Sequence, residues 1–250
     1  MQHQDGHSHL IAATIPNCIS YDPTYAYELA VIVQDGLDKM YQQQKNCFYY
    51  ITVMNENYPH PEIPVGVEEG IINGIYPLKK SKSKVKKRVQ LMGCGTILRE
   101  VEAAAQLLQD EWGVAADIWS VTSVNQLRRE GLACQRWNLL NPEAEPKVPY
   151  LTQQLEGAVG PVIAASDYMK AYFDQLRPFI SSAFRVLGAD GFGRSDTRDK
   201  LRHFFEVNRY FVVVAALSAL VEQGSVKPAT VATALKKYGI SADKLDPSLI

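Results

Sequence analysis

The first ten residues, MQHQDGHSHL, hold the densest group of reactive side chains in the chain. His3, Asp5, His7 and His9 occur at every second position, so an extended backbone would point all four to one side. Imidazoles titrate near neutral pH and can donate or accept protons, and a neighbouring carboxylate can orient such a ring or raise its pKa. The spacing therefore indicates a proton-handling patch for a polar substrate. The alternative is a solvated chain start without fixed partners.

Two glycine-containing segments are candidate anion-binding turns. Gly93-Cys94-Gly95-Thr96 precedes a predicted helix, and LGADGFGRSD holds Gly188, Gly191 and Gly193. Neither segment has the G-x-G-x-x-G spacing or a Walker lysine motif, so connecting turns are favoured. The four cysteines form no C-x-x-C pair and have no short spacing to histidine, which argues against a zinc site and a disulfide framework.

Charge gives a local signal but no global one. The chain has 26 basic and 27 acidic residues, yet seven of the ten residues from Lys79 to Arg88 are basic. This run has no interleaved aromatic residues, so a solvated connecting loop is favoured over a nucleic-acid site. The longest strongly apolar run, Tyr210 to Val221, is about twelve residues and too short to span a bilayer. We expect a soluble, cytoplasmic protein without a nucleic-acid or membrane partner.

The elements that would position the reactive residues alternate between strand and helix. Residues 10–21 predict a strand entry and a strand, residues 26–43 an amphipathic helix, and residues 47–54 a strand buried on both faces. Asp22 or Thr24 is predicted to cap the helix. Residues 58–66, YPHPEIPVG, hold three prolines and mark the expected boundary between a first region, 1–60, and a second, 61–250.

The second region repeats the same alternation. We predict strands at 89–92, 116–121, 161–165 and 184–187, and helices at 97–112, 123–130, 168–176, 197–205, 208–223 and 228–238, with Thr96 capping the first of these helices. This order is typical of an α/β fold in which helices cover a mostly parallel sheet.

Several motifs together carry a family resemblance. HQDGHSH, TIPNCISYDPTYAYELA, FYYITVMNENY, WSVTSVNQLRREG, ASDYMK and GADGFGRSDTRDKLRHFFEV occur in this order along the chain. In these runs the chain resembles the carboxyl-terminal part of the homodimeric pyruvate dehydrogenases, the decarboxylating first components of the bacterial complex. These enzymes belong to the transketolase-like, thiamine-diphosphate-dependent family. The resemblance covers essentially all 250 residues.

The resemblance implies a fold, a reaction and partners. Residues 1–60 would be the last part of a pyrimidine-binding domain, present as a βαβ unit, and residues 61–250 a transketolase-like carboxyl-terminal domain. The family's enzymes decarboxylate pyruvate and pass the two-carbon unit to a lipoyl group on an acetyltransferase component. His3 matches a family histidine beside the bound substrate, and Asp5 and His9 match the E-D-G-x-x-H positions that touch substrate in transketolases.

Departures from the family pattern limit what this chain would do alone. The family grips the diphosphate and Mg²⁺ through Gly-Asp-Gly and downstream asparagines, whereas Gly188-Ala189-Asp190-Gly191 breaks that motif. We therefore assign no cofactor or metal ligand to this chain and expect thiamine diphosphate to need the missing amino-terminal region. The stretch 54–57 also lacks the arginine that takes a sugar phosphate in transketolases, which favours a small 2-oxo acid. The alternative function is a non-catalytic dimerisation or assembly module.

Overall fold

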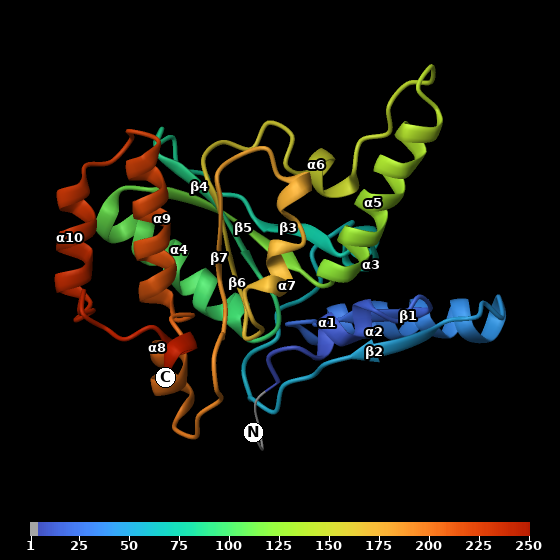
Figure 1. Cartoon of the computed structure of the whole chain (residues 1–250), viewed down its shortest axis with the longest axis horizontal. Coiled ribbons are helices and arrows are strands. Elements are labelled where there is room, and N and C mark those ends of the chain that lie inside the picture. Colours follow the sequence, from blue (N-terminus) through green and yellow to red (C-terminus); the bar gives the residue numbers. More distant parts are fainter. Residues whose placement is uncertain (1–4) are drawn as a thin grey trace.

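The computed structural model describes residues 5–250, which contain two sheets of unequal size. The larger sheet has the order β3-β5-β4-β6-β7, and only its edge strand β3 runs antiparallel (Figure 1). Its strands are β3 (Ile75–Lys79), β4 (Arg88–Gly93), β5 (Ala115–Val121), β6 (Val162–Ala165) and β7 (Phe184–Leu187). The expected α/β class with a mostly parallel, helix-covered sheet is confirmed.

Helices cover both faces of the larger sheet because its strands bury side chains in both directions. Val89 and Leu91 of β4 pack on one face, against α4 (Ile97–Trp112) and α9 (Arg209–Glu222). Met92, on the opposite face, packs in a second core. That core includes side chains from α5 (Val124–Leu140), α6 (Tyr150–Gln154) and α7 (Ala171–Asp174). The chain closes with α8 (Arg198–Phe204), α10 (Pro228–Lys237) and the 3₁₀ turn η3 (Pro247–Leu249).

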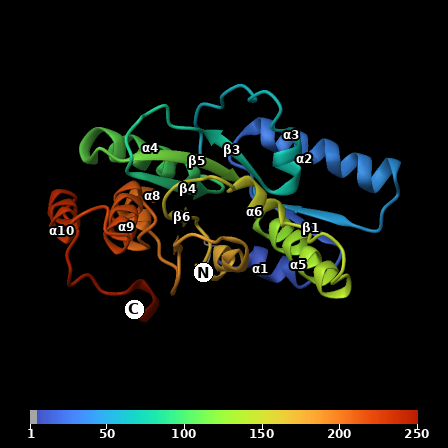
Figure 2. The same cartoon turned by 90° about the horizontal axis from the view of Figure 1, so that it is seen from above.

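The smaller sheet lies beside the first (Figure 2) and confirms the predicted βαβ unit. Its elements are α1 (Ser8–Ala13), β1 (Cys18–Tyr21), α2 (Ala26–Leu37), the π-helical turn η1 (Asp38–Gln42) and β2 (Phe48–Ile51). β1 and β2 pair in parallel with Cys18 opposite Phe48. α3 (Glu68–Asn73) packs on α2 and leads into β3. The remaining element is the 3₁₀ turn η2 (Arg177–Phe179).

Glu28 of α2 connects the two sheets. Its fully buried carboxylate accepts hydrogen bonds from the Tyr76 and Ser120 hydroxyls, both at 2.6 Å, and from the backbone N–H groups of Thr24 and Tyr25. A buried carboxylate with four donors is strongly held, because each donor would otherwise lose a partner. Tyr76 and Ser120 belong to β3 and β5, so this contact fixes the small sheet against the edge of the large one.

Several local predictions differ from the structure. Residues 10–13 are helical rather than the entry to a strand. β2 is partly exposed, with Phe48 43% accessible, so it is not buried on both faces. In residues 5–250 it pairs only with β1 and therefore lies at a sheet edge. The helix predicted at 123–130 continues to Leu140, and the helix predicted at 168–176 is reduced to α7.

The proline-rich stretch 58–66 is irregular, as predicted, and connects the two sheets. The division into regions at residue 60 stays a prediction. Residues 80–87 of the basic run form the connection between β3 and β4, as predicted, whereas Lys79 ends β3 and Arg88 begins β4.

One stretch, Arg198–Glu222, is long and apolar enough to cross a membrane by length and composition, with 56% of its window buried inside the protein. Asn208 interrupts it, because it lies between α8 and α9 and accepts hydrogen bonds from the N–H groups of Tyr210 and Phe211. The apolar side chains of α9 pack on α4 and β6. The stretch is therefore explained as a short helix followed by a core helix.

Candidate active site

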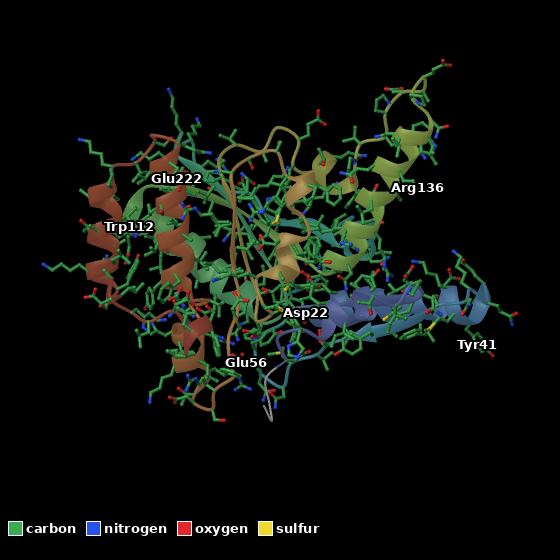
Figure 3. The ribbon with its side chains drawn as sticks, in the orientation of Figure 1. Asp22, Tyr41, Glu56, Trp112, Arg136 and Glu222 are labelled. Carbon is green, nitrogen blue, oxygen red and sulfur yellow. The ribbon has the colours of Figure 1, made fainter. Side chains whose placement is uncertain are left out.

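The carboxyl ends of the parallel strands of both sheets meet in one place. In open α/β sheets, functional sites form at the carboxyl ends of the strands. Asp22 follows β1, Thr52 follows β2, and Cys94 follows β4, while Asp167 and Tyr168 follow β6. Contacts join the two sheets here, since the Tyr168 hydroxyl lies 3.1 Å from the Thr52 hydroxyl. Figure 3 shows Asp22 and Glu56 near this end of the molecule. The site is therefore built from segments that are far apart in the sequence.

The predicted amino-terminal cluster is divided by the structure. His3 lies outside the described residues. The Asp5 carboxylate is exposed and accepts hydrogen bonds from the N–H groups of His7 and Ser8, at 3.2 and 2.9 Å, which starts α1. Because residues from Ser8 onward are helical, the expected one-sided alternation of an extended segment is wrong: His7 is exposed while His9 is buried. The catalytic assignment of His3, Asp5 and His9 stays a prediction.

The place where the strand ends of the two sheets meet is called the junction below. His9 lies inside it, with 0% exposure. Its Nε2 is 2.9 Å from the Thr52 hydroxyl, and its ring stacks on Tyr172 at 5.2 Å and meets the edges of Tyr168 and Tyr50. Burial among these rings lowers the pKa of His9 to about 4, because an imidazolium would lose its hydration there. The ring is therefore neutral at pH 7 and can accept or relay a proton but does not present a positive charge.

Asp22 is a functional candidate that the sequence reasoning missed. It was assigned to a helix cap, but its carboxylate is buried, with 3% exposure, and accepts a 2.6 Å hydrogen bond from Thr52 and a 3.3 Å bond from Tyr168. Burial raises the pKa of Asp22 to about 6, despite these donors. Perturbed acids of this kind are common at functional sites. The available signal was its position directly after a parallel strand.

Asp167 was also missed. It follows β6, and burial raises its pKa to about 7, with the Arg202 guanidinium acting in the opposite direction. The Cys94 thiol faces Asp22, and burial among these acids raises its pKa well above its ordinary value, so it is a thiol rather than a thiolate nucleophile. The junction therefore contains acids that exchange protons near neutral pH but no activated cysteine.

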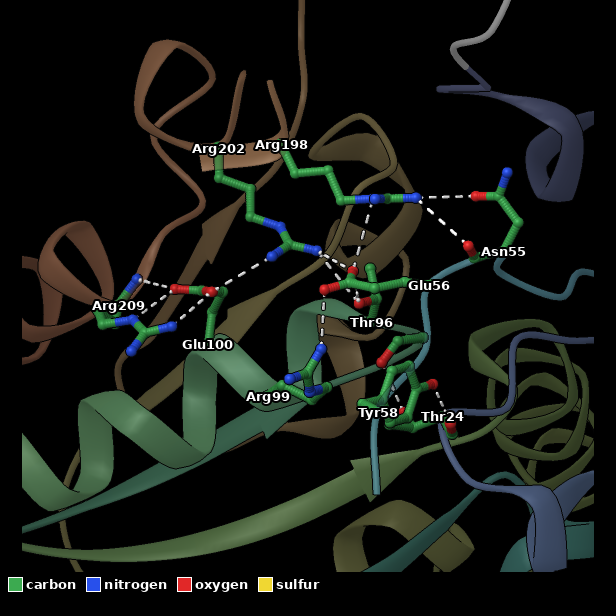
Figure 4. Close-up of polar contacts among 11 residues, drawn as sticks. Thr24, Asn55, Glu56, Tyr58, Thr96, Arg99, Glu100, Arg198, Arg202 and Arg209 are labelled. Atoms are coloured by element: carbon green, nitrogen blue, oxygen red, sulfur yellow. Dashed lines mark hydrogen bonds and ion pairs between the residues drawn. The ribbon is translucent and has the colours of Figure 1, made fainter. Parts of the chain in front are cut away.

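A second polar cluster, around Glu56 and Glu100, lies next to the junction, and its carboxylates are paired with arginines (Figure 4). It is called the matched cluster below. Glu56 accepts hydrogen bonds from Thr96 and Arg99 at 2.8 Å and from Arg202 at 2.7 Å. Hydrogen bonds and these cations lower the pKa of Glu56. Thr96 is the N-cap residue of α4, as predicted, but its hydroxyl is used here and makes no cap bond.

The matched charges continue into α4. Glu100 accepts three hydrogen bonds from Arg209 at 2.9 Å and contacts Arg202 at 3.4 Å, which lowers the pKa of its carboxyl. A cavity of about 430 Å³ is lined by ten residues: Tyr25, Glu56, Pro59, Arg99, Glu100, Glu102, Ala103, Asp199, Arg202 and Arg209. Its three arginines each pair with a carboxylate, so the cavity does not present an uncompensated cradle for an anion.

The segment 54–57 contains no arginine itself, but arginines from other elements contact it. Arg198 donates to the Asn55 side chain at 2.9 Å and lies 3.7 Å from Glu56, while Arg99 and Arg202 also reach Glu56. These arginines come from α4 and α8. Because Glu56 is paired with all three arginines, the preference for a small 2-oxo acid over a sugar phosphate stays a prediction.

The described residues do not fit a diphosphate and its metal. Within residues 5–250, no group of three or more His, Cys, Asp or Glu side chains is arranged to hold a metal ion. Gly188 packs against the backbone of Tyr168 and Lys170, and Gly191, at φ +100°, packs against Pro247. Asp190 between them pairs with Lys170 at 3.5 Å. This loop is therefore closed by its own protein contacts.

Comparison with known proteins identifies two family regions. The model of the pyruvate dehydrogenase E1 component middle domain matches residues 1–61, and that of the transketolase-like C-terminal domain matches residues 74–208. The pyruvate dehydrogenase E1 component of Pseudomonas aeruginosa is 57% identical over 99% of this chain. The chain spans 28% of the length of that relative. The E1 and transketolase-like families depend on thiamine diphosphate.

Solved structures agree on the fold. Transketolase from Campylobacter jejuni matches 86% of this chain and 28% of its own, with a TM-score of 0.58 and 19% identity. A split-gene transketolase, described as an inactive beta4 tetramer, matches 88% of this chain and 62% of its own, with a TM-score of 0.55 and 16% identity. The chain therefore belongs to the transketolase-like C-terminal domain family, and it corresponds over its whole length to part of the pyruvate dehydrogenase E1 components.

Proposed function

We propose that this chain is the carboxyl-terminal part of a cytoplasmic, homodimeric pyruvate dehydrogenase E1 component. The complete enzyme would use thiamine diphosphate and Mg²⁺ to decarboxylate pyruvate and pass the acetyl unit to the lipoyl group of an acetyltransferase component. The observation that carries the proposal is 57% identity to such an enzyme over 99% of the chain. The buried proton-exchanging cluster at the strand ends supports a contribution to the chemistry rather than to the scaffold alone.

In this assignment the chain supplies proton-handling groups and the missing region supplies the cofactor grip. His3, Asp5 and His9 are the proposed substrate-side residues. The ring of His9 is neutral at pH 7, because its pKa is about 4, so by itself it is a weak base and needs a second group to hold the proton that it accepts. The isolated chain is expected to be inactive. The split-gene transketolase described as inactive, which this chain resembles in fold, is a parallel for that expectation.

A chimaera tests the proposal. This chain would replace the matching part of the Pseudomonas aeruginosa relative, and pyruvate-dependent release of carbon dioxide and acetylation of a lipoyl domain would be measured with thiamine diphosphate and Mg²⁺. We expect activity from the chimaera and none from the isolated chain. His3→Ala and His9→Ala should lower kcat by about 10²–10⁴-fold, while His203→Ala, which removes an imidazole of α8 that contacts Asn208 and Phe211, should not.

Two outcomes would overturn the assignment. A folded, cofactor-loaded chimaera that releases no carbon dioxide would exclude a catalytic contribution. Activity of the isolated chain would contradict the proposal that the residues that hold thiamine diphosphate and Mg²⁺ lie outside this chain. If the chimaera is active but insensitive to both histidine substitutions, the chain acts only as a scaffold.

The second candidate function, a dimerisation or assembly module, is favoured by exposed apolar side chains along the small sheet. Leu37 and Tyr41 are exposed on α2 and η1, at 59% and 78%. Exposed large apolar groups that gather on one element are typical of interfaces. Leu37→Glu with Tyr41→Glu should convert a dimer to a monomer in sedimentation velocity. A wild-type chain that sediments as a monomer would exclude a self-association role for this face.

A further inference from the structure

Three side chains in the candidate active site, two of them buried and the middle one, Thr52, half-buried, are joined by continuous hydrogen bonds. The Thr52 hydroxyl is 2.6 Å from Oδ1 of Asp22 and 2.9 Å from Nε2 of His9. Both end residues are buried, with exposures of 3% for Asp22 and 0% for His9. No comparison with known proteins assigns a role to Asp22 or Thr52. The positions of the protons along these hydrogen bonds follow from the number of donors.

The donors can be counted. A threonine hydroxyl has one proton and two lone pairs. Thr52 donates to Asp22, because its 2.6 Å contact with that carboxylate is much shorter than its 3.4 Å contact with the Tyr21 carbonyl. Its lone pairs then accept from His9 and from the Tyr168 hydroxyl, whose one proton is shared between Thr52 at 3.1 Å and Asp22 at 3.3 Å. His9 must therefore carry its proton on Nε2 while Asp22 is ionised.

The other ring nitrogen follows from this count. With the proton on Nε2, Nδ1 of His9 is a bare acceptor, and it is a buried atom without a hydrogen-bond partner among the described residues. Buried polar atoms without a partner are rare and often mark a functional position. The neighbouring Tyr172 hydroxyl is likewise buried and unpartnered within residues 5–250. Nδ1 is thus the ring atom whose lone pair is not used by a hydrogen bond within residues 5–250.

We propose that Asp22 and Thr52 are positioning residues that relay protons for His9. A hydronium ion gives a proton to Nδ1, so that one of its O–H bonds breaks and an N–H bond forms; the Nε2 proton moves to the Thr52 oxygen, and the Thr52 proton moves to Asp22. The products are the neutral Nδ1–H tautomer, a neutral hydroxyl and a neutral carboxylic acid, so the added charge cancels that of the carboxylate. No imidazolium has to form in the buried site.

Two further observations support the relay. Burial lowers the pKa of His9 to about 4 and raises that of Asp22 to about 6, so a proton in this cluster is more stable on Asp22. The carboxylate is also held in place, because Gly95, at φ +49°, lies so close that an added Cβ would be 2.5 Å from Oδ2 of Asp22. A fixed carboxylate and a fixed ring are what a relay through one hydroxyl requires.

Other titratable groups face the relay from every packed element. They are Glu28 of α2, Tyr50 of β2, Cys94 after β4, Asp167 and Tyr168 after β6, Tyr172 of α7 and Asp5 before α1. Burial raises the pKa values of Cys94, Tyr168 and Tyr172, so these groups keep their protons over the range of interest. Asp167 titrates in the same range, with a pKa of about 7, so its carboxyl signal must be followed separately.

NMR of the isotopically labelled 250-residue chain tests the relay. The ¹⁵N shifts of His9 distinguish its two neutral tautomers from the imidazolium, and the ¹³C shift of Asp22 reports its protonation. We expect Nε2–H at pH 8 and a change to Nδ1–H, without imidazolium, as Asp22 protonates at a pH of about 6. An Nδ1–H ring at pH 8, or an imidazolium forming as Asp22 protonates, would overturn the proposal.

Variants separate a relay from mere packing. Thr52→Val should uncouple the ring from Asp22, whereas Thr52→Ser should restore the coupling because it keeps the hydroxyl. Asp22→Asn removes the titrating group, so the ring should hold one tautomer throughout. Thr233→Val, which removes an exposed hydroxyl elsewhere, and Asp167→Asn are controls that should leave the tautomer change intact. A Thr52→Val ring that titrates like the wild type would refute the relay.

The catalytic meaning of the relay rests on the proposed function, but its test does not. The NMR readout needs no substrate, cofactor or other domain, so an inactive chimaera would leave the relay standing. Conversely, if the chimaera is active but the tautomer of the His9 ring does not change when Asp22 protonates, the relay is refuted and the proposed function stands. If both hold, Thr52→Val in the chimaera should lower kcat by at least tenfold and shift its pH profile, and Thr52→Ser should recover it.

Discussion

Two polar clusters lie side by side in this protein and hold their charges in opposite ways. Around Asp22 the buried acid is surrounded by neutral donors, and its pKa rises to about 6. Around Glu56 and Glu100 each carboxylate meets arginines, and the pKa of each carboxyl falls. The first arrangement keeps a proton available near neutral pH, while the second fixes charge permanently. This contrast separates a site suited to chemistry from one suited to holding segments together.

Breaking the matched cluster should have the largest effect. Glu100→Ala leaves Arg209 without its carboxylate and removes one of the two acids that face the buried Arg202. Removing one partner of a buried ion pair costs about 3–5 kcal/mol, because the remaining charge stays desolvated. Urea denaturation at pH 7 would measure the loss of unfolding free energy. A loss below 1 kcal/mol would show that solvent screens this cluster.

Crowding the Asp22 cluster should cost somewhat less. Gly95→Ala places a Cβ 2.5 Å from the Asp22 carboxylate at a backbone φ of +49°. Strain and overpacking together should destabilise the fold by about 2–4 kcal/mol. The matched control is Gly113→Ala, at φ +60° with no atom within 4 Å, which should cost only about 1 kcal/mol. Equal losses in denaturation experiments would mean that Asp22 is not held by Gly95.

The two clusters should also give opposite pH dependences. Asp22 has a folded pKa of about 6 against an ordinary value of 3.8, so its contribution to stability falls as the pH rises from about 4 to 6. Relative to wild type, Asp22→Asn should gain roughly 2–3 kcal/mol of unfolding free energy between pH 4 and pH 8.

Glu56 has a lowered pKa, so its contribution is present above its ordinary value of 4.5 and lost as the pH falls through the folded pKa. Glu56→Gln should therefore be more costly at pH 7 than at pH 3. Denaturation at several pH values measures both variants. Slopes of the same sign would remove the distinction between the two clusters.

An exposed ion pair gives the smallest expected effect and sharpens the comparison. Arg185 and Glu222 are paired with side-chain exposures of 33% and 62%. Because water screens this pair, Glu222→Gln should cost less than 1 kcal/mol. The same denaturation assay would compare it with Glu100→Ala. A cost as large as that of Glu100→Ala would show that burial is not what makes the matched cluster stabilising.

Local pattern predicted much of the fold, because helix and strand periodicities are properties of neighbouring residues. The predicted bounds of α4 and β7 match the structure, and α4 ends where Gly113 adopts a positive φ. α1 was missed although Asp5 can accept a hydrogen bond from the N–H of Ser8, where α1 begins, a local signal that the alternation of histidines obscured. The exposure of β2 could not be predicted, since it depends on how many strands lie beside it.

The sequence by itself determined the alternating elements, the family and the amino-terminal histidines, because each is written in short runs of residues. Only the tertiary structure decided which side chains meet. Asp22 contacts Thr52 and Tyr168, which are 30 and 146 residues away, and Glu56 meets arginines from α4 and α8. A pKa depends on such distant neighbours and on burial, so the proton-holding properties of these carboxylates appear only once the chain has folded.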